Sequence, residues 1–97
     1  MLNIINKSPY AGSAFDSALK TAEGSILLIE DGVYAAAKGG AAEARLKAAM
    51  GKLKLYALAQ DLEARGMADR VIDGITTVDY AGFVDLVTEH KTCQSWL

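Results

Sequence analysis

Two adjacent carboxylates, Glu30 and Asp31, directly follow the apolar run from Ile26 to Ile29. Carboxylates at the carboxyl end of a buried strand can bind a metal ion or exchange protons with a substrate. Adjacent residues on a strand point to opposite faces of the sheet, however, so these two would share a site only if the chain turned between them. The structural alternative, which we favour, is that Asp31 caps a helix starting near Gly32 and that the glycine permits a tight turn.

His90 and Cys93 form the second candidate constellation and lie three residues apart near the C-terminus. They could be a nucleophile pair in which the histidine promotes ionisation of the thiol. A zinc site would need at least three protein ligands, and the chain has no second histidine or cysteine, so no metal site is expected. The alternative is a partly exposed thiol beside a histidine that suits the negative end of a helix dipole. We favour this alternative. If any residue of the chain is a nucleophile, Cys93 is the candidate.

Phosphate binding is not expected from the glycine-containing segment 32–42. It holds glycines and a lysine but has the spacing of neither nucleotide-binding fingerprint, so we expect no cofactor. Tyr10 and Tyr34 are predicted to lie on loops at strand ends, where exposed aromatic side chains suit a protein interface. Ordinary packing remains an equal alternative for both. Together with Asp31 and Gly32, these tyrosines make up a possible partner surface.

Strand-like and helix-like segments alternate along the chain. We predict strands over residues 2–6, 25–30, 52–59 and 75–78, and helices over residues 13–22, 41–50, 60–66 and 80–90, with a short helix-prone stretch after residue 32. This alternation predicts a mostly parallel sheet with right-handed crossovers and helices on both faces. The fold class is therefore α/β, a three-layer α/β/α arrangement around a mostly parallel sheet of four or five strands. Functional sites are expected at the carboxyl ends of the strands.

Two predicted helices carry apolar stripes with helical spacing. These are Phe15, Ala18, Leu19 and Ala22 in the first helix, and Tyr80, Phe83, Val84 and Val87 in the last. Asp79 directly precedes the last helix and is predicted to cap it. The tail "TCQSWL" is predicted to add a short edge strand anchored by Trp96.

Composition and charge exclude several classes of protein. The chain has 97 residues, 52% of them hydrophobic and 23% charged, which is typical of one small globular domain. A formal net charge of −2, with ten scattered basic residues, argues against direct nucleic-acid binding. No stretch is long enough to span a membrane. The N-terminus lacks the features of a signal peptide and the single cysteine allows no internal disulfide, so we expect a cytoplasmic protein.

Five segments together carry a resemblance to a known family. They are "NKSPY" at 6–10, "LLIEDGVYAA" at 27–36, "LKLYALAQDLEARG" at 53–66, "VDYAGFVDLV" at 78–87 and the ending "QSWL". Their order and spacing resemble the DsrH/TusB family of sulfur relay proteins over nearly the whole chain. The resemblance implies one DsrH/TusB-like domain over residues 1–97, with a DsrE-like fold.

The same resemblance implies a function and partners. Such proteins are the small subunit of a sulfurtransferase complex of DsrEFH or TusBCD type, a heterohexamer with DsrE/TusD-like and DsrF/TusC-like subunits. The complex relays persulfide sulfur to a DsrC/TusE-type carrier. The sulfur serves either 2-thiouridine formation at the tRNA wobble position or intracellular sulfur oxidation.

Some family members carry a cysteine in the first helix, where this chain has Ala18. The resemblance therefore implies a non-catalytic subunit, with the active thiol on the DsrE/TusD-like partner. Two alternatives stay open. The chain could itself carry sulfur on Cys93, or it could be a small-ligand-binding domain of flavodoxin-like shape. The choice between tRNA thiolation and sulfur oxidation also stays open, because "GKLKLY" and "YAGFVDL" favour the second and Ala18 favours the first.

Overall fold

The computed structural model describes residues 1–10, 13–21 and 23–96. Its strands are β1 (Leu2–Ile5), β2 (Ser25–Leu28), β3 (Lys54–Leu58), β4 (Thr76–Val78) and β5 (Cys93–Trp96). Its helices are α1 (Ala14–Thr21), the 3₁₀ helix η1 (Glu30–Ala36), α2 (Glu43–Ala49), α3 (Ala59–Ala64) and α4 (Tyr80–Glu89). The predicted alternation of strands and helices is confirmed, although most elements are shorter than the patterns suggested. The predicted contribution of Ala22 to the first stripe lies outside the described residues.

The strands form one five-stranded sheet in the order β4-β3-β2-β1-β5, and all four strand pairings are parallel. The predicted edge strand is confirmed as β5, which pairs with β1 alone. Trp96 anchors it, since its indole Nε1 donates to Asn3 Oδ1 at 3.2 Å and its ring packs against the core.

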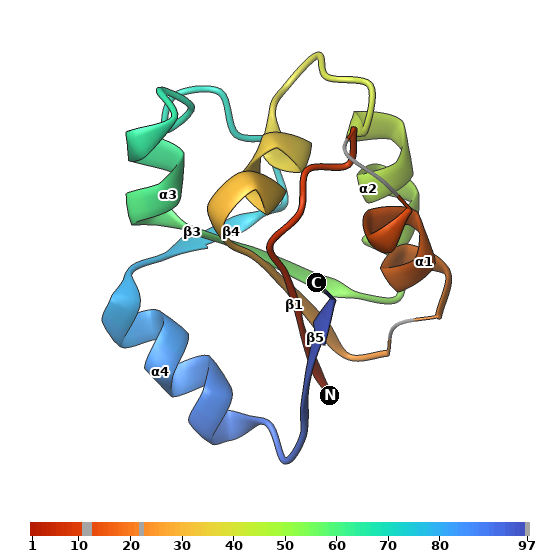
Figure 1. Ribbon diagram of the computed structural model, residues 1–97, viewed down its shortest axis with the longest axis vertical. Coiled ribbons are helices and arrows are strands. Elements are labelled where there is room, and N and C mark those ends of the chain that lie inside the picture. The colour runs from red at the N-terminus through yellow and green to blue at the C-terminus, as the bar shows by residue number, and fades with distance from the viewer. Residues whose placement is uncertain (11–12, 22, 97) are drawn as a thin grey trace.

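Strand order explains how the helices are shared between the two sheet faces. From β1 to β4 each connection moves in the same direction across the sheet, so right-handed crossovers place α1, η1, α2 and α3 on one face. Only the connection from β4 to β5 runs back the other way, which puts α4 alone on the opposite face. Figure 1 shows this separation, and it confirms the predicted three-layer α/β/α arrangement.

The two faces differ sharply in their apolar cores. On the face with four helices, a large cluster of buried side chains includes Phe15, Ile26 and Leu46, all with 0% exposure. On the α4 face only Leu2, Leu27 and Leu86 are buried among the described residues of that cluster. Their apolar neighbours there are only partly buried, namely Ile4, Ile29, Tyr56, Val78 and Phe83. β2 is buried on both faces, as its continuous apolar run predicted.

Helix α4 begins as predicted but does not face the sheet as its stripe suggested. Asp79 Oδ1 accepts a hydrogen bond from the Gly82 N–H at 2.8 Å, which confirms the predicted cap. The stripe, however, leaves Tyr80, Val84 and Val87 exposed by 57%, 63% and 40%. Since α4 has no second described helix beside it on this face, the sheet covers only the side of α4 that carries Leu86. None of the described helices is both long and apolar enough to cross a membrane.

Candidate functional site

The chain turns sharply where β2 ends. Glu30 has a φ of 49°, the left-handed conformation that non-glycine residues adopt rarely and at a cost. Its backbone N–H donates to Asp61 Oδ2 at 2.6 Å. The turn is therefore held by a carboxylate that comes from α3, 31 residues further along the chain.

Asp31 does not cap a helix, and that interpretation was wrong. The 3₁₀ helix η1 already begins at Glu30, its N-cap residue is Ile29, and Ile29 makes no side-chain cap hydrogen bond. Asp31 Oδ1 instead accepts from Arg65 Nε at 3.1 Å and from Arg65 Nη2 at 2.9 Å. The Asp31 carboxylate is thus held in an ion pair with Arg65.

Arg65 links three parts of this strand-end region. Besides pairing with Asp31, its Nη1 donates to the Asp61 carbonyl oxygen at 3.4 Å, and its guanidinium lies 5.9 Å from the centre of the Tyr34 ring. The hydrogen bond with Asp31 is the main reason that the pKa of Arg65 is raised above its ordinary value. The group stays cationic at every physiological pH, so it positions its neighbours and does not transfer protons.

Gly32 is required by close packing at this turn. A Cβ at this position would lie 2.3 Å from the Ile5 carbonyl oxygen and 3.0 Å from the Ile5 carbonyl carbon. The Gly32 N–H also donates to the Ile29 carbonyl oxygen at 2.8 Å. The predicted tight turn is therefore present, but the glycine is needed because η1 packs directly against the end of β1.

Both tyrosines of the possible partner surface are exposed, Tyr10 by 59% and Tyr34 by 39%. The Tyr10 N–H donates to Ser8 Oγ at 3.1 Å, and its hydroxyl lies against Gly40. The structure brings Asp31 and Tyr34 together through Arg65, while Tyr10 stands on the separate loop after β1. Exposure fits the predicted partner role of these side chains, which stays a prediction.

His90 and Cys93 do not act as a pair in this structure. His90 Nδ1 donates to the Leu86 carbonyl oxygen at 2.7 Å, and its Nε2 lies 3.1 Å from Ser25 Oγ. In the neutral ring Nε2 then accepts the Ser25 hydroxyl proton. Both ring nitrogens therefore have partners other than the thiol, and the contact of Nε2 with Ser25 joins the end of α4 to β2. Cys93 is an exposed thiol at the start of β5.

Ala18 has 0% exposure and lies in the larger core cluster. A thiol here would be buried among apolar side chains, where ionisation is disfavoured. In this chain the position contributes only to packing.

Four residues of the strand-end region were missed from the sequence. Asp61 and Arg65 stand four apart on α3, a spacing that predicts an ion pair and could have drawn attention to them. Asn6 and Gln60 gave no such signal. Their side-chain oxygens, Asn6 Oδ1 and Gln60 Oε1, are buried and have no hydrogen-bond partner among the described residues.

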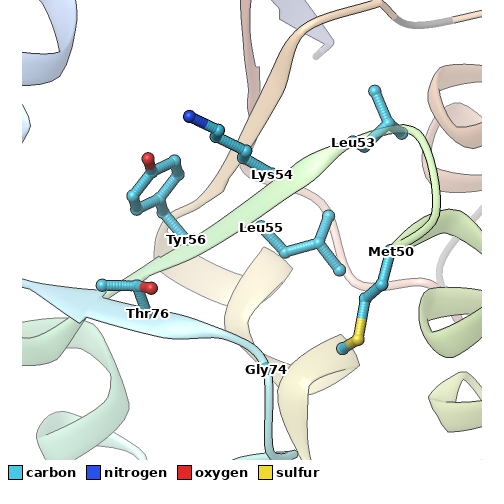
Figure 2. A pocket seen from close by; sticks show the side chains of 7 residues that line it. All are labelled: Met50, Leu53, Lys54, Leu55, Tyr56, Gly74 and Thr76. Atoms are coloured by element: carbon cyan, nitrogen blue, oxygen red, sulfur yellow. The ribbon is translucent and has the colours of Figure 1, made fainter.

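The structure also has a hollow of about 440 Å³ at the opposite, amino-terminal ends of β3 and β4. Figure 2 shows its lining: Met50, Leu53, Lys54, Leu55, Tyr56, Gly74 and Thr76. This hollow does not lie at the carboxyl ends, where a flavodoxin-like domain would bind its ligand. Among the described residues, no group of three His, Cys, Asp or Glu side chains could hold a metal ion.

Comparison with known proteins gives a consistent result over nearly the whole chain. The family model described as "DsrH like protein" matches residues 7–93. A "Protein TusB" from Pectobacterium parmentieri is 36% identical over 98 residues, covering 99% of this chain and 100% of the relative. A "Protein TusB" from Escherichia coli O81 (strain ED1a) is 37% identical with the same coverage.

Two solved structures share the fold at low sequence identity. The ychN protein from E. coli superposes with a TM-score of 0.80 at 14% identity, over 97% of both chains. MTH1491 from Methanobacterium thermoautotrophicum, described as a protein of unknown function, superposes with a TM-score of 0.76 at 15% identity, over 97% of this chain and 96% of its own. These similarities confirm the α/β fold that the sequence predicted.

Proposed function

This chain belongs to the DsrH/TusB family of sulfur relay proteins, and we propose that it is the small, non-catalytic subunit of a TusBCD-type sulfurtransferase complex. Residues 1–97 form its one DsrH/TusB-like domain in this proposal. Its partners are a DsrE/TusD-like and a DsrF/TusC-like subunit, and the assembly acts in the cytoplasm. The full-length match to TusB relatives is the observation that carries the proposal.

The reaction proposed for the complex is the relay of persulfide sulfur to a DsrC/TusE-type carrier. The nucleophilic thiol belongs to the DsrE/TusD-like partner. Two features of this chain support that division of labour. Ala18 stands at the position of a cysteine that some family members carry, and both ring nitrogens of the one histidine, His90, are hydrogen-bonded to groups other than the Cys93 thiol.

Of the two pathways, we propose thiolation of the tRNA wobble uridine. The support is the identity of 36% and 37% to proteins named TusB, over 99% of this chain. A role in intracellular sulfur oxidation is the alternative.

Contact with tRNA is proposed to occur through the partners. Of the ten lysine and arginine residues, five are paired with a carboxylate in the described part of the chain, which lowers the positive potential they present. They are Lys38, Arg45, Lys47, Arg65 and Arg70. A nucleic-acid surface would instead present unpaired cations along the phosphate backbone.

Persulfide loading tests the non-catalytic role. The assembled complex and the isolated chain are each incubated with a persulfide-forming cysteine desulfurase and cysteine, and intact masses are measured. We expect one added sulfur on the DsrE/TusD-like chain and none on this chain. Rapid sulfur loading of Cys93, abolished by Cys93→Ser, would instead make this chain a sulfur carrier in its own right.

Nucleotide titration tests the remaining alternative, in which the chain is a ligand-binding domain of flavodoxin-like shape. Titration of the isolated chain with FMN, NAD and ATP is expected to give no saturable signal. Tight binding of any one of them would contradict the proposed role as a relay subunit.

A further inference from the structure

A groove of about 370 Å³ lies between α1 and α2, on the sheet face that carries four helices. Figure 1 shows these two helices side by side. Each contributes residues at helical spacing, which places them along one side of it. They occupy positions 16, 19 and 20 on α1, and positions 45, 48, 49 and 52 on α2 and the turn that follows it. The walls of the groove are therefore two helix surfaces and not mobile loops.

The floor of the groove is apolar. Leu19 and Ala49 are 9% and 6% exposed and belong to the larger core cluster, so they form a fixed base. Ala48 is exposed beside them, and its small side chain leaves room above the base. Peptide-binding grooves use an apolar base of this kind to hold an anchor side chain of the bound segment.

The charged side chains around this floor are mostly cationic. Three cations and one carboxylate line the groove, namely Lys20, Arg45, Lys52 and Asp16. Their net charge is +2, in a chain whose formal net charge is −2. Arg45 and Asp16 form an ion pair between the two helices, and the Arg45 guanidinium lies 5.5 Å from the centre of the Phe15 ring. The excess positive charge therefore comes from Lys20 and Lys52, which are both exposed.

Charged residues close to the groove do not cancel this excess. Glu43 and Lys47 on α2 pair with each other, with Lys47 Nζ 2.9 Å from Glu43 Oε2. Glu23, in the loop after α1, is exposed and does not line the groove. Even if Glu23 is counted with the lining residues, the net charge stays positive.

An anionic occupant is therefore favoured, and the apolar floor separates its possible classes. A nucleic-acid strand needs a track of unpaired cations for its phosphates. Of the cations that line the groove, only Lys20 and Lys52 lack an ion pair in the described part of the chain. A protein segment can place carboxylates beside these two lysines and an apolar side chain on Leu19. Such a segment would use both the charge and the floor of the groove.

We infer that the groove between α1 and α2 binds an acidic segment of another protein, which inserts an apolar side chain flanked by carboxylates. The inference goes beyond the proposed function and does not depend on it, because it uses only the shape and charge of this surface. Binding weakens as the salt concentration rises, since Lys20 and Lys52 are exposed and dissolved ions screen their charges.

Synthetic peptides test the groove on the whole isolated chain. The probe is the acetylated and amidated peptide Glu-Glu-Leu-Glu-Glu. A matched peptide with serine in place of leucine removes only the apolar anchor. Binding is followed through the amide chemical shifts of the isotope-labelled chain, and spectra recorded without peptide check that each variant is folded.

Two double variants separate the groove from the overall charge of the chain. Lys20→Glu with Lys52→Glu reverses the charge of the groove. Lys7→Glu with Lys91→Glu is the matched control, since both of these lysines are exposed and neither lines the groove. The two double variants have the same formal net charge.

We expect the leucine peptide to give saturable shifts at Leu19, Ala48 and Ala49. The serine peptide should bind at least about fivefold more weakly, because it loses the apolar contact. The groove variant should bind the leucine peptide at least about tenfold more weakly than the wild type, and the control variant should bind it nearly as well as the wild type.

Several results would overturn the inference. The absence of saturable shifts with the leucine peptide would show that the groove does not bind acidic segments. Equal weakening in both double variants would mean that the overall charge attracts the peptide, and equal binding of the two peptides would mean that the apolar floor is not used. The two peptides are compared on the wild type, so this comparison holds even if a variant fails to fold. A single-stranded RNA that shifts the same amides, where the leucine peptide does not, would identify nucleic acid as the occupant.

Discussion

The two faces of the sheet are built from the same strands but are covered to different degrees. On one face, α1, η1, α2 and α3 enclose a continuous apolar core. On the other, α4 covers a small core around Leu2, Leu27 and Leu86 and leaves its own stripe exposed. The difference follows from strand order, because the connections from β1 to β4 run one way across the sheet and only the last one returns.

The strand-end turn and the exposed side of α4 also differ in how far they are satisfied by contacts within the chain. The strand-end turn, where chemistry was first suspected, proves to be closed by pairs within the chain, namely Asp31 with Arg65 and the Glu30 N–H with Asp61. The apolar flank of α4 has no such internal partner among the described residues. The exposed side of α4 is thus the less completely satisfied of the two regions.

The largest expected effect compares the two cores directly. Leu46→Ala removes a fully buried side chain from the four-helix face and should lower the free energy of unfolding by about 4 kcal/mol. Leu86→Ala, in the smaller core beneath α4, should cost about 2 kcal/mol because the thinner layer relaxes around the gap. Urea titration of the two variants measures both values. Equal losses in the free energy of unfolding would show that the two cores contribute equally to stability.

Gly32→Ala tests the close approach of η1 to β1. The new methyl group would meet the Ile5 carbonyl oxygen at 2.3 Å, so the turn must shift, at a cost of about 2–3 kcal/mol. Gly51→Ala is the matched control, since no atom lies within 4 Å of the place its methyl group would take and its φ is not positive. Thermal melts of both variants measure the effect, and the control should be neutral or slightly stabilising. A harmless Gly32→Ala would mean that the turn has room to move.

Asp79→Ala removes the cap of α4 and should lower the free energy of unfolding by about 1 kcal/mol. Chemical denaturation of the isolated chain measures this loss. An unchanged free energy of unfolding would show that the cap does not stabilise α4.

Asp31→Ala should have the smallest effect. The Asp31 side chain is 61% exposed, so its ion pair with Arg65 is expected to contribute under about 1 kcal/mol. Sulfur transfer by the assembled complex should persist, because the carboxylate positions Arg65 and takes no chemical part. Loss of sulfur transfer with folding and assembly intact would assign chemistry to Asp31.

Local sequence patterns predicted the helices and strands well, because each pattern is contained within one short segment. The apolar run Ile26 to Ile29 predicts a strand buried on both faces, and Asp79 before a helical pattern predicts a cap. The register of β5 could not be read locally, yet Trp96 signalled that the tail would be anchored. These features depend on neighbours in sequence, which is where pattern reasoning is strongest.

The features that were missed depend on contacts distant in sequence. Asp31 and Arg65 are 34 residues apart, and their pairing replaced the predicted cap. The orientation of α4 depends on which helices share its sheet face, so the periodicity of its apolar residues could not reveal which of them would stay exposed. Asn6 and Gln60 became notable only through burial, which no local pattern reports.

Native mass spectrometry of this chain, co-expressed with its DsrE-like and DsrF-like counterparts, tests the proposed role most directly. A relay subunit should appear in a mixed assembly with two copies of each of the three chains. A monomer or homodimer that ignores both counterparts would contradict the role, and the function of the exposed Cys93 would then have to be tested on the isolated chain.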